Sequence, residues 1–327
     1  MATVVCMATG GTIAATFDPD LGGLRATMPA SGLFDGIPGL GDLAEVELVQ
    51  PTIADSTSLS PAQVLGWSTT IGQALERPEV AGAVVLQGTD TLEECAYLFD
   101  LTLATEKPVV FSGAMRSPDE IGFDGIRNAT GAISSAVSPH CRGLGALVVM
   151  NDQIHAAREV EKAHTTALEA FVSALGPLGF VGDGGRQVKI RRQPMGREHV
   201  PTTRLEPRVA LLTCALGTNS TPVDAALRAG ARGLVVAALG AGDVPREMAR
   251  GLERALAAGI AVVVARRCAA GEVVPRYADV GSGRWLADRG ALFASDLSAA
   301  KARIKLMLAL GSGDGNEGAQ HFESWPR

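Results

Sequence analysis

Short, continuously apolar runs recur along this chain, and they constrain its fold more than any other feature of the sequence. They are rich in β-branched residues and lie at residues 3–8, 83–87, 108–113, 144–150, 208–214, 232–238 and 259–265. A strand with one exposed face alternates apolar and polar residues, whereas a strand buried on both faces is apolar throughout. The runs therefore predict parallel sheets that are covered on both faces.

Helical patterns separate these runs. One helical face would carry Leu92, Ala96, Phe99 and Leu103. Residues 243–258 fit a helix with Asp243 as its cap and Gly259 just past its end. Because strands and helices alternate, we expect an α/β fold. It would comprise a larger N-terminal domain, with a mainly parallel sheet flanked by helices, and a smaller C-terminal α/β domain with a parallel sheet.

One internal segment interrupts the alternation of predicted strands and helices. Residues 182–207 are rich in Gly, Pro and charged residues, which is typical of a linker. We place the linker at 186–207, between an N-terminal domain at 1–185 and a C-terminal domain at 208–327. A length of 327 residues fits two domains. The tail at 311–327 is predicted to be largely unstructured.

Charge and hydropathy exclude several classes of function. The formal net charge is −6, and the only basic cluster is Lys189, Arg191 and Arg192, so nucleic-acid binding is not expected. No apolar run approaches the ~20 residues of a membrane-spanning helix. The first residues lack the basic region of a signal peptide. We expect a soluble cytoplasmic protein that does not act at a membrane.

The cysteines are scattered and odd in number. They are Cys6, Cys95, Cys141, Cys214 and Cys268. With no C-x-x-C pair, they favour reduced, buried thiols in the cytosol over a disulfide framework. The chain also lacks clustered His, Cys and Asp residues with metal-ligand spacing. No metal or cofactor is expected.

Two predicted strands end in hydroxyl-bearing turns. Thr89 and Asp90 follow the strand that ends in VVLQ, and Thr12 follows Gly10 and Gly11 after the first strand. Ligands of open parallel sheets bind beyond the carboxyl ends of the strands. The alternative is a pair of ordinary turns with hydroxyl capping. Thr91 and Glu94 indeed fit a capping box, but that pattern leaves Thr89 and Asp90 unexplained. A phosphate loop is disfavoured, because neither G-x-G-x-x-G nor G-K-[ST] occurs.

Longer motifs carry a resemblance to a known family. They are ATGGTIAA (8–15), QGTDTLEECAYLFDLTL (87–103), KPVVFSGAMRS (107–117), DGIRNATGAI (124–133), VVMNDQIHAAREVEKAHTT (148–166), FVSALGPLGFV (171–181) and KARIKLMLAL (301–310). In this order and register, they resemble the bacterial-type L-asparaginase/glutaminase family over nearly the whole chain.

The resemblance implies a threonine amidohydrolase. A threonine hydroxyl would attack the side-chain amide of L-asparagine, of glutamine or of a modified amide, releasing ammonia through an acyl-enzyme. The catalytic positions would be Thr12, Thr89, Asp90 and Lys162. A free hydroxyl is a poor nucleophile, and a lysine beside it lowers its proton affinity. Without the resemblance, Lys162 would be interpreted as a solvated lysine beside acidic neighbours.

The resemblance also implies a substrate pocket. Its residues would be Gly11, Ser56, Thr57, Gly88, Thr89, Asp90 and Ala114, with Ser56 and Thr57 binding the α-carboxylate and Ala114 facing the amide through its backbone. The alternative for this motif, ADSTSLSPAQV (54–64), is that Asp55 to Ser58 form a loop and that Ser60 and Pro61 cap the helix that follows; both can be true. The family further implies a homo-oligomer, a dimer or a homotetramer built from dimers with sites at the dimer interface.

The chain departs from the family at the pocket. Residues 15–33 lack the usual lid tyrosine, and Leu24 and Arg25 lie near its place. Gln87 stands where the family has histidine. These departures surround the expected positions of the substrate's amino and carboxylate ends, so they bear on substrate identity more than on the type of reaction.

The resemblance also implies that the C-terminal domain contributes polar groups to the active site of a neighbouring subunit, and here too the chain departs from the family. Asp243 stands where an asparagine is common, or is only a helix cap, and Glu272 and Tyr277 are candidates for the group lent to a neighbouring subunit. Two other functions stay open. One is an ammonia-supplying amidase subunit, and the other is an amino-acid-binding sensor.

Overall fold

The computed structural model describes residues 1–51, 55–313 and 321–322. The chain divides into two compact units, residues 1–199 and residues 200–327. Each unit has its own sheet and its own apolar core. In the part of the chain that the structure describes, no helix has the length and apolar character needed to cross a membrane.

An eight-stranded sheet forms the centre of the first unit, in the order β12-β11-β8-β7-β6-β5-β1-β4. Its strands are β1 (Thr3–Ala8), β4 (Glu45–Val49), β5 (Val80–Leu86), β6 (Val109–Ser112), β7 (Ala146–Met150), β8 (Gln153–Ala156), β11 (Gly179–Gly182) and β12 (Gln187–Ile190). The strands from β4 to β7 pair in parallel, and β8, β11 and β12 add antiparallel pairs at one edge. The predicted, mainly parallel sheet is confirmed.

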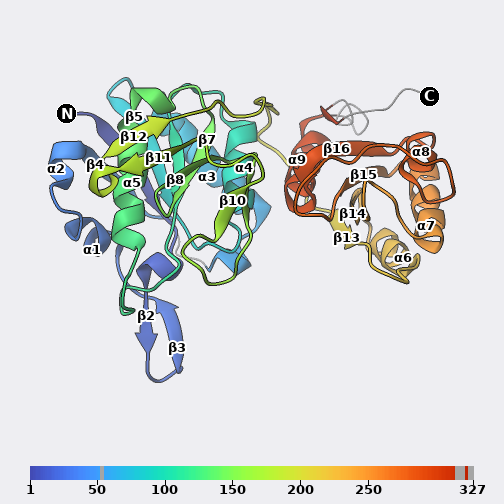
Figure 1. Cartoon of the computed structure of the whole chain (residues 1–327), viewed down its shortest axis with the longest axis horizontal. Coiled ribbons are helices and arrows are strands. Elements are labelled where there is room, and N and C mark those ends of the chain that lie inside the picture. Colours follow the sequence, from blue (N-terminus) through green and yellow to red (C-terminus); the bar gives the residue numbers. More distant parts are fainter. Residues whose placement is uncertain (52–54, 314–320, 323–327) are drawn as a thin grey trace. The chain divides into compact units, whose positions relative to one another are not determined.

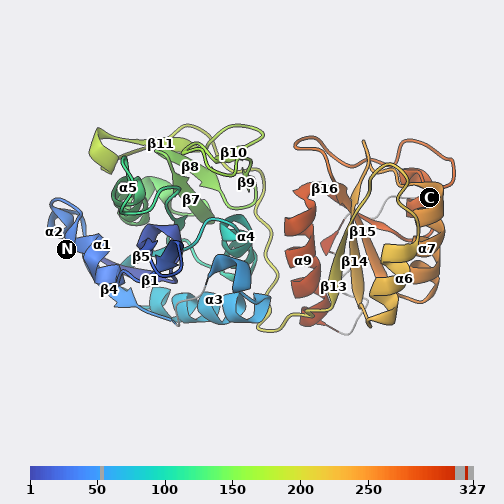
Figure 2. The same ribbon diagram turned by 90° about the horizontal axis from the view of Figure 1, so that it is seen from below.

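Helices cover both faces of this sheet (Figure 2). Helices α3 (Pro61–Leu75) and α4 (Leu92–Thr102) pack together on one face, and α5 (Gly125–Val137) covers the other. The remaining helical segments are α1 (Ala30–Asp35), α2 (Leu40–Leu43), η1 (Thr12–Ala14), η2 (Ser56–Ser58), η3 (Pro139–Cys141) and η4 (Asp183–Gly185). Central strands such as β5 and β6 are almost wholly buried, because both faces of the sheet are covered.

Two antiparallel ribbons lie outside the main sheet. One consists of β2 (Ala15–Asp18) and β3 (Gly23–Ala26), and it projects from the unit as a hairpin (Figure 1). The other consists of β9 (Val160–Lys162) and β10 (Phe171–Ser173). Neither ribbon is hydrogen-bonded into the eight-stranded sheet, so contacts with other elements must position them.

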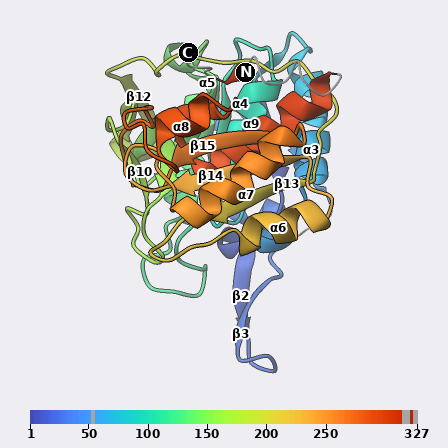
Figure 3. The same ribbon diagram turned by 90° about the vertical axis from the view of Figure 1, so that its right-hand side faces the viewer.

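The second unit is a smaller α/β layer structure. Its four strands are all parallel and follow chain order: β13 (Val209–Thr213), β14 (Gly233–Ala238), β15 (Ala261–Arg266) and β16 (Leu292–Ser298). Its helices are α6 (Thr221–Arg228), α7 (Arg246–Ala257), α8 (Gly283–Ala287) and α9 (Ala299–Ser312). Figure 3 shows α6 to α8 on the near side of the sheet, and α9 packs on the other face.

The segment predicted as a linker is partly a strand. Gln187–Ile190 forms β12, which pairs with β11, and Val188 and Ile190 pack against the core. The compact units divide between His199 and Val200. The prediction missed β12 because Gly, Pro and charged residues surround a run of only four residues.

One smaller expectation was also wrong. Asp243 does not cap a helix, because α7 begins at Arg246 after Pro245, and the Asp243 carboxylate accepts a hydrogen bond from the Gly283 amide at 3.0 Å. Most of the tail at 311–327 is outside the described residues, so the prediction that it is largely unstructured stays a prediction; its described residues include the end of α9 at Ser312 and a buried Phe322. Residues 314–320 and 323–327 lie outside the described part of the chain.

Candidate active site

Two glycine turns at the ends of neighbouring strands meet directly. Gly11 follows β1 with φ 91°, a left-handed value that favours glycine. A Cβ atom at Gly11 would overlap the backbone of Gly88, which follows β5. β1 and β5 pair in parallel, so their carboxyl ends lie at the same edge of the sheet. The two motifs that the sequence singled out are thus in backbone contact.

A third segment joins this contact. A Cβ atom at Gly88 would lie 2.6 Å from Ser56 Oγ, so the serine in η2 packs against the glycine turn. The Thr91 hydroxyl donates a hydrogen bond to the Ser56 carbonyl at 2.9 Å. Thr91 is the N-cap residue of α4, but its side chain makes no capping hydrogen bond. The predicted capping box with Glu94 is therefore wrong, because the Thr91 hydroxyl binds the Ser56 segment instead.

Lys162 contacts both residues of the second motif. Its Nζ donates to Thr89 Oγ1 at 2.8 Å and to Asp90 Oδ1 at 2.7 Å. The Lys162 side chain is 15% exposed and that of Asp90 is 55% exposed, whereas Thr89 is buried. A cation, a hydroxyl and a carboxylate therefore form one contact group from two segments that lie some seventy residues apart in sequence.

Thr12, Thr89 and Asp90 line one cavity of about 520 Å³, and Lys162 contacts its wall through Thr89 and Asp90. The lining residues are Gly11, Thr12, Ala15, Leu24, Arg25, Asp55, Ser56, Gly88, Thr89 and Asp90. Among the described residues, Thr12 Oγ1 has no hydrogen-bond partner, whereas Thr89 Oγ1 accepts from Lys162. The two threonines are therefore not equivalent: one hydroxyl is available at the cavity, and the other is paired with a cation.

The β2–β3 hairpin supplies one wall of the cavity without a tyrosine. Leu24 and Arg25 lie on β3 and line the cavity. Leu24 is half exposed, and the Arg25 guanidinium pairs only loosely with Asp18, at 3.9 Å. The hairpin is also fixed from outside, because the Phe17 amide on β2 donates to Asp119 Oδ2 at 2.7 Å.

Ala114 lies on a loop that is held by two polar side chains, the partly buried Asp124 and the buried Asn128. The Asp124 carboxylate accepts the amide hydrogens of Met115 and Arg116 at 3.0 to 3.1 Å. Asn128 Nδ2 donates to the Gly113 carbonyl at 3.0 Å. A Cβ atom at Gly113 would approach Thr89 Cγ2 to 3.2 Å. These contacts place the Ala114 loop next to the Thr89 turn.

Gln87 lies behind the Thr89 turn and not in the cavity lining. Its side-chain amide donates to Cys95 Sγ at 3.1 Å and to Thr91 Oγ1 at 3.4 Å. Burial raises the pKa of the Cys95 thiol to about 12, so the thiol is neutral near pH 7. Gln87 thus stabilises the first turn of α4.

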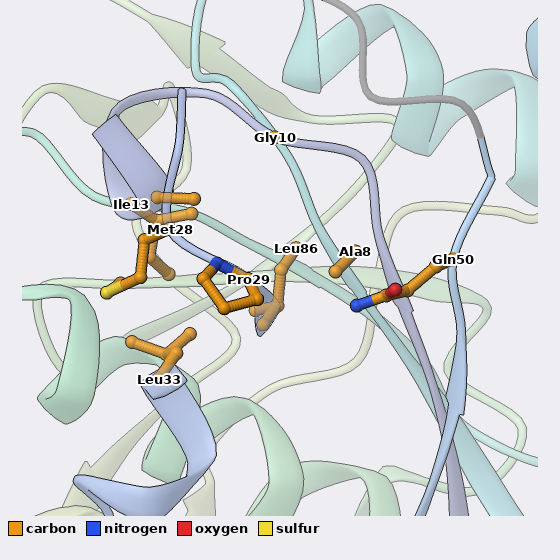
Figure 4. A pocket seen from close by; sticks show the side chains of 9 residues that line it. Ala8, Gly10, Ile13, Met28, Pro29, Leu33, Gln50 and Leu86 are labelled. Atoms are coloured by element: carbon orange, nitrogen blue, oxygen red, sulfur yellow. The ribbon is translucent and has the colours of Figure 1, made fainter. Parts of the chain in front are cut away.

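A second cavity, lined in part by Gly10 and Ile13, is mostly apolar (Figure 4). It is lined by Ala8, Gly10, Ile13, Ala14, Met28, Pro29, Leu33, Gln50 and Leu86. Its volume of about 30 Å³ is the size of a water molecule. Of these two cavities, the larger, polar one has room for an amino-acid-sized ligand.

The predicted site residues are only partly brought together. Thr57 is exposed on η2, where its amide donates to Asp55. Ser60 forms a capping box with Gln63 on α3, as expected. Glu272 and Tyr277 are exposed in the second unit. Motif residue 54, which precedes Asp55, lies outside the described residues.

Sequence reasoning missed two residues at the site. Asp55 lines the cavity, and Glu93 accepts a hydrogen bond from the Lys162 backbone amide. Asp55 had been assigned to a loop, and Glu93 carries no sequence signal beyond its place in a helical first turn. Among the described residues, no group of three His, Cys, Asp or Glu side chains is arranged to hold a metal ion.

The fold and the site together are those of an enzyme. Hydroxyl, ammonium and carboxylate groups from separate segments gather in a cavity at the carboxyl ends of parallel strands, where α/β enzymes bind their ligands. Residues 3–196 match the family model "Asparaginase, N-terminal", and residues 208–322 match "Glutaminase/Asparaginase C-terminal domain".

Individual relatives agree with these matches. An L-asparaginase of Bacillus licheniformis is 33% identical over 310 residues, covering 94% of this chain and 95% of the relative. A glutaminase-asparaginase of Pseudomonas fluorescens is 32% identical over 323 residues, covering 95% and 86%. The crystal structure of a probable cytoplasmic L-asparaginase from Campylobacter jejuni superimposes with a TM-score of 0.86 at 30% identity, covering 99% and 100% of the two chains. The chain belongs to the asparaginase family, whose members are hydrolases of amide C–N bonds.

Proposed function

We propose that this amidohydrolase cleaves the side-chain amide of L-asparagine through an acyl-enzyme on Thr12. The observation that carries the proposal is the contact of Lys162 Nζ with Thr89 Oγ1 and Asp90 Oδ1, on the wall of a cavity that also exposes Thr12. The names of the relatives, L-asparaginase and glutaminase-asparaginase, support asparagine as the first substrate to test and glutamine as the second.

The reaction needs two displacements at one carbon atom. The Thr12 oxygen attacks the amide carbon, the C–N bond breaks, and the hydroxyl proton leaves with the nitrogen as ammonia. Water then attacks the resulting ester and restores the Thr12 hydroxyl. The Lys162 ammonium lowers the proton affinity of the Thr89 hydroxyl, so that Thr89 can relay protons. Backbone amides of the Gly-containing turns are suited to stabilise the oxyanion.

The other ends of the substrate are assigned by charge. Asp90 is half exposed at the cavity, so its carboxylate can bind the substrate ammonium while it pairs with Lys162. We assign the substrate carboxylate to the η2 segment, through Ser56 and Thr57. The Ala114 backbone would contact the amide. These roles follow the resemblance, and the hydrogen bonds that hold the Ala114 loop near Thr89 support the last one.

Ammonia release by the purified protein tests this function. The substrates are L-asparagine, L-glutamine, D-asparagine and N-substituted amides, and the variants are Thr12→Ala, Thr89→Val and Lys162→Met. Thr70→Val, on the exposed side of α3, is the matched control. We expect L-asparagine turnover in the wild type and the control, and its loss in all three site variants.

The same experiment separates the alternatives. A sensor would show a higher melting temperature with amino acids but release no ammonia. An ammonia-supplying subunit would release ammonia only when its partner is added. Either result would replace the proposed function.

We also propose that the protein is cytoplasmic and forms a homo-oligomer, a dimer or a homotetramer. Five free cysteines, four of them buried, support a reducing compartment. Light scattering coupled to size-exclusion chromatography measures the number of subunits, and a monomeric mass would contradict the oligomer.

A further inference from the structure

We propose that Glu93 is a positioning residue that holds Lys162 at the distance from Thr89 that catalysis needs. The inference rests on the proposed function, because it assigns a role within the same site. The Glu93 carboxylate accepts a hydrogen bond from the backbone amide of Lys162. The side chain of the same lysine bonds Thr89 and Asp90. Lys162 is thus held at its backbone and at its Nζ by one stretch of five residues, 89–93.

We call the hydrogen bond between Glu93 and the Lys162 backbone amide the tether. The lysine needs this tether because of where it lies in the fold. Lys162 is the last residue of β9, which pairs with β10 alone and is not part of the main sheet. The ladder of the eight-stranded sheet therefore does not fix its distance from Thr89. The hydrogen bond from Glu93 joins the ribbon directly to the first turn of α4, which begins two residues after Asp90.

Glu93 is well placed for this role because its own position is fixed. It is the second residue of α4, and its neighbours Leu92 and Cys95 are buried. The N-cap residue Thr91 is bound to the Ser56 carbonyl. A carboxylate in a first helical turn is also favoured by the helix dipole. The tether thus connects the lysine to a rigid element and not to a loop.

The consequence of losing the tether is a misplaced cation. Nζ lies 2.8 Å from Thr89 Oγ1, and a misplacement of about 1 Å in such a group lowers a rate by about 100-fold. Substrate contacts at Asp90 and Ser56 do not involve Glu93. The loss should therefore fall on kcat, with KM changed little.

The test compares kcat and KM for ammonia release in the wild type, Glu93→Ala, Glu93→Gln and Glu94→Ala. We expect Glu93→Ala to lower kcat at least about 10-fold, with KM within about twofold. Glu93→Gln should restore most of the rate, because its amide oxygen also accepts the Lys162 N–H. Glu94→Ala removes the same charge from the same helical turn, so it is the matched control and should behave as wild type.

A double variant decides whether Glu93 acts through Lys162. In a Lys162→Met background, Glu93→Ala should cause no further loss, because there is no cation left to position. Independent, multiplicative losses would overturn the inference. So would wild-type kcat in Glu93→Ala, or equal losses in Glu93→Gln and Glu93→Ala. If Glu93→Ala does not fold, Glu93→Asp, whose carboxylate is one methylene shorter, should give the same kcat loss, and an unchanged kcat overturns the proposal.

Failure of this inference differs from failure of the proposed function. If Lys162→Met keeps wild-type activity, the catalytic role of the lysine is wrong whatever Glu93 does. If Lys162→Met is inactive while Glu93→Ala is unaffected, only the positioning role is wrong.

Discussion

The parallel strands of the two units end in loops of very different character. In the first unit, polar side chains at the strand ends bond one another, as in the group of Thr89, Asp90 and Lys162. In the second unit, two polar side chains near the strand ends bond backbone atoms. The Arg266 guanidinium donates to the carbonyls of Asp296, Cys268 and Ala269, and Asp243 accepts from the Gly283 amide.

Strand order accounts for this difference. In the first unit, β1 lies between β4 and β5, so the chain leaves β1 on one side and returns on the other. Ligands of open α/β sheets bind at such a reversal, and Thr12 and Thr89 follow the two strands β1 and β5. The second sheet runs in simple order from β13 to β16 without a reversal. Its strand-end side chains are used to hold loops.

Removing the Lys162 cation should have the largest effect on activity. Lys162→Met should lower kcat about 1,000-fold, because it removes the group that polarises Thr89. Unfolding free energy should change by less than about 1 kcal/mol, because the partner Asp90 is half exposed. Ammonia release and urea unfolding measure the two effects, with exposed Lys189→Met as the control. A large stability loss with retained kcat would give Lys162 the structural role seen in the second unit.

Matched glycine turns sharpen the comparison. Gly11 and Gly240 both follow a strand with positive φ, but only Gly11 abuts another backbone. Gly11→Ala should lower the unfolding free energy by about 3 kcal/mol and abolish activity. Gly240→Ala has open space around it and should cost about 1 kcal/mol, the strain of a left-handed alanine, with full activity. Equal effects in urea unfolding would show that the contact between Gly11 and Gly88 is not formed.

Arg266→Met tests the second unit. The Arg266 side chain is buried and donates to three carbonyls, so its loss should lower the unfolding free energy by about 2 kcal/mol. The kcat per folded molecule should stay within about twofold. Denaturant unfolding and active-site-normalised kinetics check both, beside exposed Arg276→Met. A kcat loss at unchanged stability would place this arginine in the catalytic machinery.

Buried thiols are a feature that both units share. Burial raises the pKa of Cys141 in the first unit and of Cys214 in the second, each to about 11. Unfolded thiols ionise near about pH 8.5, so above that pH the unfolded chain loses protons that the folded chain keeps. The contribution of these thiols to the unfolding free energy should therefore be fully present below that pH. It should be lost as the pH rises toward about 11.

Cysteine variants measure this alkaline effect. Between pH 9 and 10, Cys141→Ala and Cys214→Ala should each reduce the loss of unfolding free energy by about 1 kcal/mol per pH unit. Cys268→Ala, at an exposed position, should leave the slope unchanged. A different slope for Cys141→Ala and Cys214→Ala would mean that the units do not bury their thiols alike.

The sequence predicted the strands that carry the site residues better than it predicted which residues lie in contact at the site. Continuous apolar runs predicted the buried strands, and therefore the strand ends that carry Thr12 and Thr89. Lys162 was found through the family resemblance alone, because the position of the β9–β10 ribbon depends on tertiary contacts that no local pattern encodes. Strand β12 was missed for a similar reason: its four residues are held by pairing with β11 and not by strong strand propensity.

The most direct test of the account is peptide mapping of the enzyme, quenched in acid during turnover of L-asparagine. Mass spectrometry would locate any covalent aspartyl group. The account predicts an aspartyl ester on Thr12 and none on Thr89, because the Thr12 hydroxyl at the cavity has no partner among the residues that the structure describes, whereas Thr89 is paired with Lys162. An ester on Thr89, or turnover without any ester in the wild type and in Thr89→Val, would contradict it.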